Sequence, residues 1–171
     1  MPDSLADRPA LPCHAGNMHR FHSSSLRRGR YSENGRIYLV TAVCRGRQPL
    51  FESPTAAATV IEEMTARVRE GRCENHCFVV MPDHVHWMLQ LSDGEDLSDI
   101  VARTKGRSAL RINSARRRRG SLWQAGFHDH AVRRDENIEN LANYTVLNPV
   151  RAGLVKRRED YPYWWSRWHA R

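Results

Sequence analysis

The 171-residue sequence contains no long run of apolar residues. No run approaches the roughly 18 residues that a membrane-spanning helix needs, and the N-terminus lacks the hydrophobic core of a secretory signal. The sequence therefore predicts no membrane partner and, by default, a cytoplasmic location. Its length and its 40% hydrophobic content are typical of one globular domain with tails.

Cysteine is also scarce, and of the four cysteines only Cys73 and Cys77 lie close together. A structural zinc site would need two further ligands at regular spacing, and none is evident. We therefore interpret the cysteines as reduced, structural thiols.

Lysine is nearly absent, because only Lys105 and Lys156 contribute to the 27 basic residues and all others are arginine. The net charge of +8 makes nucleic acid the leading class of partner. Arginine suits phosphate because its planar guanidinium can bind two oxygen atoms at once, although a GC-rich genome would also favour arginine.

The apolar pattern alternates between strand and helix periodicity. The predicted order is a strand over 36–44, a helix over 54–70, strands over 73–81 and 84–91, a helix over 96–119, a strand over 128–133 and a helix from 135 to 148. Ser53 and Asp135 are the expected N-caps of the first and last helices. The tight Pro82-Asp83 connection predicts that the two middle strands form a hairpin.

Two histidines, His84 and His86, lie two residues apart in the third predicted strand. Residues at this spacing share one face of a strand, with side chains roughly 6 to 7 Å apart, which is close enough to bind one metal ion. Alternatively, they are half-buried polar residues on the exposed face of an edge strand. The spacing recurs in His128-Asp129-His130, where polar edge residues or phosphate contacts are the alternatives to a second metal pair.

Tyr144 and Asn148 lie four residues apart on one predicted helix. Their side chains are therefore expected on one face, roughly 6 Å apart. This spacing places a nucleophile candidate beside a metal-ligand candidate. Combined with two imidazoles, the amide and phenol oxygens would suit Mg²⁺ or Mn²⁺ and leave positions open for phosphate.

Basic and aromatic residues gather in three stretches. Eight basic residues and no acidic one lie between Arg103 and Arg119, a density that a polyanion explains better than a solvated face does. Five arginines lie between Arg20 and Arg36. The stretch 161–168 holds three tryptophans and two tyrosines, which would either stack on bases or anchor the C-terminus to the core.

Several separated motifs, taken together in their order, resemble the REP-associated tyrosine transposases, which are single-tyrosine HUH transposases of bacterial insertion sequences. The resemblance covers roughly residues 27–165. The segments 27–31 and 47–51 are similar to the family's opening. The other motifs are Pro82-Asp83-His84-Val85-His86, Lys105-Gly106-Arg107-Ser108, the segment from Leu122 to His130, and the segment from Tyr144 to Val155.

This resemblance implies an α+β fold, in which helices pack on a ferredoxin-like antiparallel sheet of the HUH endonuclease type. We divide the chain accordingly into a flexible basic arm (1–35), an HUH transposase domain (36–155) and an aromatic, basic tail (156–171). The family acts on single-stranded DNA that carries a palindromic REP hairpin, as a monomer or a homodimer.

The resemblance also implies roles for individual residues. Tyr144 matches the nucleophile, which would form a 5′-phosphotyrosine intermediate and rejoin DNA by transesterification. His84, His86 and Asn148 match the ligands of a divalent metal, Mg²⁺ or Mn²⁺. The remaining candidates would contact DNA through charge or an aromatic ring: Arg27, Arg28, Arg30, Lys105, Arg107, Arg111, Arg116, Arg117, Arg118, Arg119, His130, Arg151, Trp164 and Trp165.

Two other functions remain open from the sequence. A non-cleaving protein that binds DNA hairpins would need the same basic surfaces without the chemistry. A metal-dependent hydrolase would use His84, His86, His128 and His130, with water rather than Tyr144 as its nucleophile.

Overall fold

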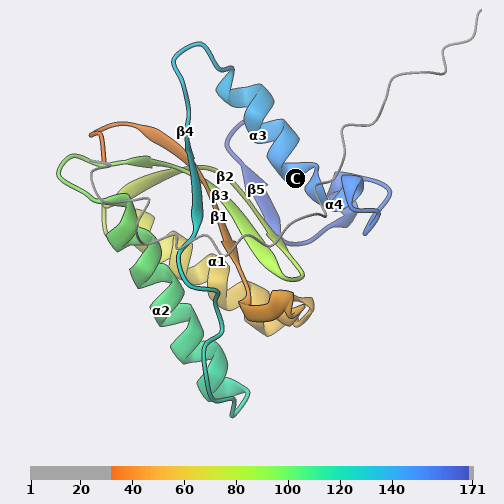
Figure 1. The fold of residues 1–171 in the computed structure, drawn as a ribbon. Coiled ribbons are helices and arrows are strands. Elements are labelled where there is room, and N and C mark those ends of the chain that lie inside the picture. The colour runs from red at the N-terminus through yellow and green to blue at the C-terminus, as the bar shows by residue number, and fades with distance from the viewer. Residues whose placement is uncertain (1–31, 170–171) are drawn as a thin grey trace, which may run out of the picture.

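The computed structural model describes residues 32–169, which form a five-stranded sheet with helices on both faces (Figure 1). The strand order is β4-β1-β3-β2-β5, and every neighbouring pair is antiparallel. The first four strands and two helices follow the order βαββαβ, so the predicted ferredoxin-like α+β fold is confirmed. The strands are β1 (Ile37–Val43), β2 (Cys73–Met81), β3 (His84–Leu91), β4 (His128–Ala131) and β5 (Trp164–Ser166).

Two long helices cover one face of the sheet, and they pack against each other. A shorter helix, α3, packs against β2 and β5 on the other face, and α4 follows it (Figure 1). The bounds are α1 (Pro54–Arg69), α2 (Leu97–Ala115), α3 (Ile138–Val146) and α4 (Asn148–Arg151), with 3-10 turns η1 (Arg45–Arg47), η2 (Leu50–Glu52) and η3 (Arg158–Asp160). No helix of residues 32–169 is both long and apolar enough to span a membrane.

Alternation along β3 places its side chains in two different environments. Val85, Trp87, Leu89 and Leu91 are buried against α1 and α2, as the pattern predicts. The predicted hairpin between β2 and β3 is also confirmed, with Met81 opposite His84. Both histidines consequently lie on the face that α3 partly covers.

The helix predicted over 96–119 ends at Ala115. Arg116 has left the helical conformation, and Arg117 has a positive φ of 49°. Continuing the helix through the four arginines 116–119 would bring like charges together at neighbouring helical positions, which is unfavourable. Instead, the chain turns back, and the Asn113 side chain donates to the carbonyl of Gly120.

The last predicted helix differs at both ends. It begins at Ile138, where the Asn137 side chain accepts from the backbone N–H of Asn140, so the prediction of Asp135 as the cap was wrong. The helix is also interrupted at Leu147, which places Tyr144 on α3 and Asn148 on α4. At the first helix, Ser53 occupies the N-cap position, but its side chain makes no capping hydrogen bond.

The interruption at Leu147 follows from Pro149, which has no N–H to donate to the carbonyl four residues earlier. That carbonyl belongs to Thr145, and it accepts from a backbone N–H at the C-cap of α3 and, at 2.8 Å, from Asn148 Nδ2. The side-chain amide thus adds a second hydrogen bond where the helix is interrupted. Tyr144 and Asn148 remain about one helical turn apart, although they lie on consecutive helices.

The C-terminal segment predicted as a tail contributes β5 to the sheet. β5 pairs with β2, with Trp164 opposite Val79 and Ser166 opposite Cys77. The Tyr161 hydroxyl donates to the carbonyl of Val80 at 2.7 Å. Part of the segment 156–171 therefore belongs structurally to the domain.

Candidate functional site

The two histidines of β3 turn the same ring nitrogen toward each other. His84 Nε2 and His86 Nε2 lie 3.1 Å apart, and the rings meet edge to face. His84 Nδ1 lies 2.5 Å from Asp83 Oδ1, and His86 Nδ1 lies 2.8 Å from Thr41 Oγ1. Each imidazole is therefore held through its Nδ1 atom, while the Nε2 atoms converge.

This arrangement fits a shared metal ion. Two ligands about 2.1 Å from one ion and 90° apart would lie about 3.0 Å from each other, which is close to the observed Nε2 separation. A carboxylate on the far nitrogen of a ligating histidine is also the usual support of such sites, because it fixes the tautomer that leaves Nε2 as a lone-pair donor. Arg47 holds that carboxylate, with Nη1 3.1 Å from Asp83 Oδ2.

The electrostatics keep His86 neutral. Burial lowers the pKa of His86 to about 4, and electrostatic interactions with His84 and Arg151 act in the same direction. For Asp83, burial would raise the pKa, but the hydrogen bonds and charges of His84 and Arg47 outweigh it and hold the pKa below its usual value. Neutral His86 and ionised Asp83 are the forms that a metal site requires.

Tyr144 lies on the flank of this pair that α3 and α4 occupy. It is 55% exposed, and the guanidinium carbon of Arg151 lies 3.8 Å above its ring. Because the charge of Arg151 also lowers the pKa of His86, its guanidinium lies within electrostatic reach of the histidine pair. Arg151 thus connects the phenol of α3 with the imidazoles of β3.

The amide of Asn148 is oriented by its neighbours. Its nitrogen donates to Thr145 as described above, and its oxygen accepts from Arg151 Nη1 at 3.4 Å. Oδ1, the atom that could bind a metal, is thus held on the side of Arg151. The structure brings His84 and His86 together, and it keeps Tyr144, Asn148 and Arg151 in one cluster beside them.

The other two histidines do not join this pair at a common metal site. His130 Nε2 instead lies 2.9 Å from Glu136 Oε2, in the segment that leads to α3. Within residues 32–169 there is no group of three or more histidine, cysteine, aspartate or glutamate side chains that could hold one ion. The hydrolase with four histidine ligands is therefore not supported.

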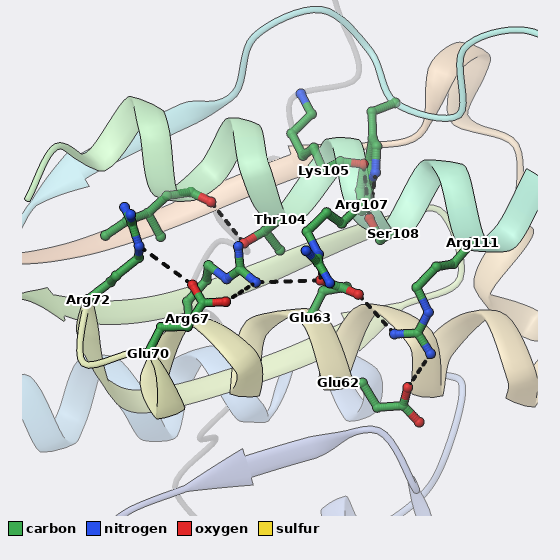
Figure 2. A network of polar contacts seen from close by, with 12 residues as sticks. Glu62, Glu63, Arg67, Glu70, Arg72, Thr104, Lys105, Arg107, Ser108 and Arg111 are labelled. Carbon is green, nitrogen blue, oxygen red and sulfur yellow. Dashed lines mark hydrogen bonds and ion pairs between the residues drawn. The ribbon is translucent and has the colours of Figure 1, made fainter.

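The basic residues of α2 face carboxylates that the pattern of α2 alone could not reveal (Figure 2). Arg107 Nε lies 3.0 Å from Glu63 Oε2, and Arg111 Nη1 lies 2.9 Å from Glu63 Oε1. Arg111 also pairs with Glu62. The eight cations are therefore partly neutralised by α1, although Arg107 and Arg111 remain substantially exposed.

The other basic residues predicted to contact DNA lie in different environments. Lys105 donates to the carbonyls of Gln124 and Gly126, and so fastens the connector that leads into β4. Arg116 and Arg118 reach Leu50 and Gln48, while Arg117 and Arg119 are exposed. Arg27, Arg28 and Arg30 lie outside the described residues.

The two adjacent tryptophans of β5 lie in different environments. Trp164 is buried beneath α3, where its Nε1 donates to the carbonyl of Arg158. Trp165 is 42% exposed and stacks on Phe78, with ring centroids 6.3 Å apart. Trp164 thus anchors the C-terminal segment, and only Trp165 presents a ring surface to solvent.

Sequence reasoning missed the residues that orient the histidines. The sequence assigns Asp83 to a tight connection and to the motif that contains both histidines, but to no contact with either imidazole; its position directly before His84 is the available signal. Thr41 could not be found from spacing, because only the register between β1 and β3 places it opposite His86. Arg47 reaches Asp83 from a 3-10 turn that the sequence pattern did not predict.

Comparisons with known proteins give consistent matches. The family model described as "Transposase IS200 like" matches residues 34–146. A putative REP-associated tyrosine transposase of Haemophilus influenzae is 26% identical over 144 residues, which cover 75% of this chain and 78% of the relative. The REP-associated tyrosine transposase of Escherichia coli is 26% identical over 135 residues, which cover 78% of each chain.

Solved structures match as well. A REP-associated tyrosine transposase bound to a REP hairpin matches with a TM-score of 0.66 at 26% identity, over 79% of each chain. A putative transposase from Deinococcus radiodurans matches with a TM-score of 0.50 at 21% identity, over 77% of this chain and 95% of that one, and supports the fold alone.

Proposed function

The chain belongs to the IS200-like transposase family, and from this premise we propose that it cleaves and rejoins single-stranded DNA beside a palindromic hairpin, using Tyr144 as the nucleophile. The observation that carries the proposal is the convergence of His84 Nε2 and His86 Nε2, with a tyrosine and an arginine beside them. The REP hairpin bound to the structural relative is the model for the substrate.

His84 and His86 would hold a divalent metal, with Asn148 Oδ1 as the third protein ligand. Mg²⁺ or Mn²⁺ bound there would supply Lewis-acid stabilisation to the scissile phosphate. Asp83 and Thr41 keep both imidazoles in position through their Nδ1 atoms, so little reorganisation is needed when the site is filled.

Tyr144 would act on the phosphate from the side of α3. Its oxygen forms a bond to phosphorus while the bond from phosphorus to the 3′ oxygen of the preceding nucleotide breaks. The products are a 5′-phosphotyrosine and a free 3′-hydroxyl. Attack by another 3′-hydroxyl reverses the step and rejoins DNA without ATP. Arg151, which lies over the phenol ring, orients it and offers a cation to the phosphate.

A covalent-adduct assay tests this function. The full chain is incubated with Mn²⁺ and an end-labelled oligonucleotide that carries a REP-type hairpin and flanking single strand, and is then denatured. We expect a labelled protein–DNA adduct with the wild type and with the matched control Tyr163→Phe, and none with Tyr144→Phe.

Each of the other possible results of this assay would exclude one part of the proposed function. An adduct that persists in Tyr144→Phe would exclude this nucleophile. Cleavage without an adduct would indicate hydrolysis by water. Tight hairpin binding without cleavage by the wild type would leave only a non-cleaving hairpin-binding function.

A further inference from the structure

A third histidine lies in the same row of the sheet as the candidate metal pair. Thr41 of β1 is opposite His86 of β3 on one side and opposite His128 of β4 on the other. Directly opposite residues in antiparallel strands point to the same face. Thr41 points toward His86, because it contacts His86 Nδ1 at 2.8 Å. His128 therefore shares that face, whereas Asp129 lies on the opposite face of β4, opposite Val40.

The spacing separates His128 from the metal ligands. His128 and His86 are two strands apart, which corresponds to roughly 10 Å between their backbones. This gap is too wide for both imidazoles to bind one ion, in agreement with the lack of a three-ligand group within residues 32–169. It is wide enough for a phosphodiester that is held at His84 and His86 to extend toward His128. The side chain of His128 is exposed, so DNA can reach it.

The strand order places His128 opposite the nucleophile. α3 packs against β2 and β5, α4 contacts β2, and β3 lies between β2 and β1. The helices α3 and α4, which carry Tyr144 and Arg151, therefore lie on the β2 side of the histidine pair. The strand β4, which carries His128, lies on the other side (Figure 1). Displacement at phosphorus is in line, so the attacking and leaving oxygens occupy opposite sides of the phosphate.

We propose that His128 is the general acid that protonates the leaving 3′ oxygen during DNA cleavage by Tyr144. This inference rests on the proposed function. In cleavage, the bond between phosphorus and the 3′ oxygen breaks, its electron pair stays on that oxygen, and the imidazolium of His128 supplies the proton. The phenol proton of Tyr144 passes to solvent as its oxygen attacks. In rejoining, neutral His128 takes its proton back from the attacking 3′-hydroxyl and solvent reprotonates the released phenolate, so no other reactant is consumed.

A substrate with a better leaving group tests the proton transfer. The scissile 3′ oxygen of the hairpin oligonucleotide is replaced by sulfur, because a thiolate leaves without protonation. General acid catalysis is worth roughly 100-fold to 10,000-fold. We expect His128→Ala to form the adduct at least 100-fold more slowly than the wild type on the oxygen substrate, and within about 5-fold of it on the sulfur substrate.

Two further variants define the role. His128→Asn keeps a hydrogen-bonding side chain but cannot transfer the proton, so it should behave as His128→Ala does. Asp129→Asn, on the other face of β4, should react on both substrates as the wild type does. Hairpin affinity and Mn²⁺ affinity, measured by anisotropy and calorimetry, should stay within about threefold of the wild type in His128→Ala, since the proposed role lies in the chemical step.

The outcomes are separable from those of the proposed function. Loss of rate in His128→Ala that is equal on both substrates, or a tenfold loss of hairpin affinity, would overturn the general-acid role. An unchanged rate on the oxygen substrate would do so as well. Failure of the wild type to form an adduct with either substrate would instead reject cleavage by Tyr144.

Discussion

The buried carboxylate of Glu63 offers a sharp test of how the two long helices are held together. Its side chain is 3% exposed and pairs with Arg107 and Arg111 of α2. Arg67, which is fully buried, has its Nη2 3.8 Å from Glu63 and 2.8 Å from the carboxylate of Glu70 (Figure 2). Replacing Glu63 by glutamine keeps its shape and removes one of the two negative charges that face the buried guanidinium.

The expected loss in the free energy of unfolding depends on which of the three arginines can turn into water once the charge of Glu63 is removed. Arg107 and Arg111 have side chains that are 60% and 46% exposed, so each can turn into water at little cost. Arg67 cannot, and losing one partner of a buried ion pair costs about 3 to 5 kcal/mol. Because Glu70 remains, we expect the low end of that range, about 3 kcal/mol. For a chain of this size the melting temperature should fall by about 6 to 12 °C.

Thermal unfolding followed by circular dichroism at pH 7 measures this effect, with Glu62→Gln as the matched control. Glu62 is 60% exposed and pairs with the 46% exposed Arg111, so loss of its charge should cost under about 1 kcal/mol. Restoring stability in the double variant Glu63→Gln with Arg67→Met would identify the unpaired guanidinium as the cause. Equal melting temperatures for the two single variants would refute the reasoning.

The same residue predicts a pH dependence. Burial alone would raise the pKa of Glu63, but the hydrogen bonds and charges of Arg111 and Arg107 outweigh it and lower the pKa from 4.5. The resulting stability is present above pH 4.5 and is lost as the pH falls through the folded-state value. Glu63→Gln should therefore show a flatter acid limb of melting temperature against pH than the wild type.

Three other predictions concern the candidate site and β5. Burial lowers the pKa of His86 from 6.5 to about 4, so the free energy of unfolding that it contributes is fully present above pH 6.5 and is lost as the pH falls toward 4. In His86→Gln, the fall of the melting temperature between pH 6.5 and 4 should therefore be smaller than in the wild type. Arg151→Gln should slow adduct formation by Tyr144 more than it weakens hairpin binding, while stability changes by about 1 kcal/mol or less; equal losses of rate and affinity would contradict an orienting role. Trp164→Ala should lower the free energy of unfolding, measured by urea denaturation, by about 3 to 5 kcal/mol, because the ring is buried. Trp165→Ala should change the free energy of unfolding little, and it should reduce hairpin affinity if the exposed ring stacks on a base.

The sequence predicted most of the fold because the local signals were strong. The alternation in β3 assigned Val85 and Trp87 to the core and both histidines to the other face, and the structure agrees. The helix ends were predicted less well. The Asn137 cap does not stand out from apolar periodicity, and α3 ends at Val146, two residues before the end at Asn148 that Pro149 predicts. β5 was missed because three residues are too short to show a period.

The site could be predicted only in part, because its geometry depends on contacts between distant segments. Spacing paired His84 with His86 and Tyr144 with Asn148, but it could not place His128 relative to either pair. That relation depends on Thr41, whose two partners come from strands on either side of β1. The ion pairs of Arg107 and Arg111 could likewise not be predicted from the sequence of α2, since Glu62 and Glu63 belong to α1.

The order of the elements along the chain also determines when, during synthesis, the residues of the candidate site become available. The ribosome delivers β1, α1, β2 and β3 first, so the histidine pair can form before β4 and α3 have emerged. Such a chain has neither Tyr144 nor the segment with His128, and its β1 edge is still unpaired. Truncated products that end before residue 128 would keep the candidate metal pair but would lack both the proposed nucleophile and His128. The last quarter of the chain, from residue 128, is therefore needed to complete the candidate site.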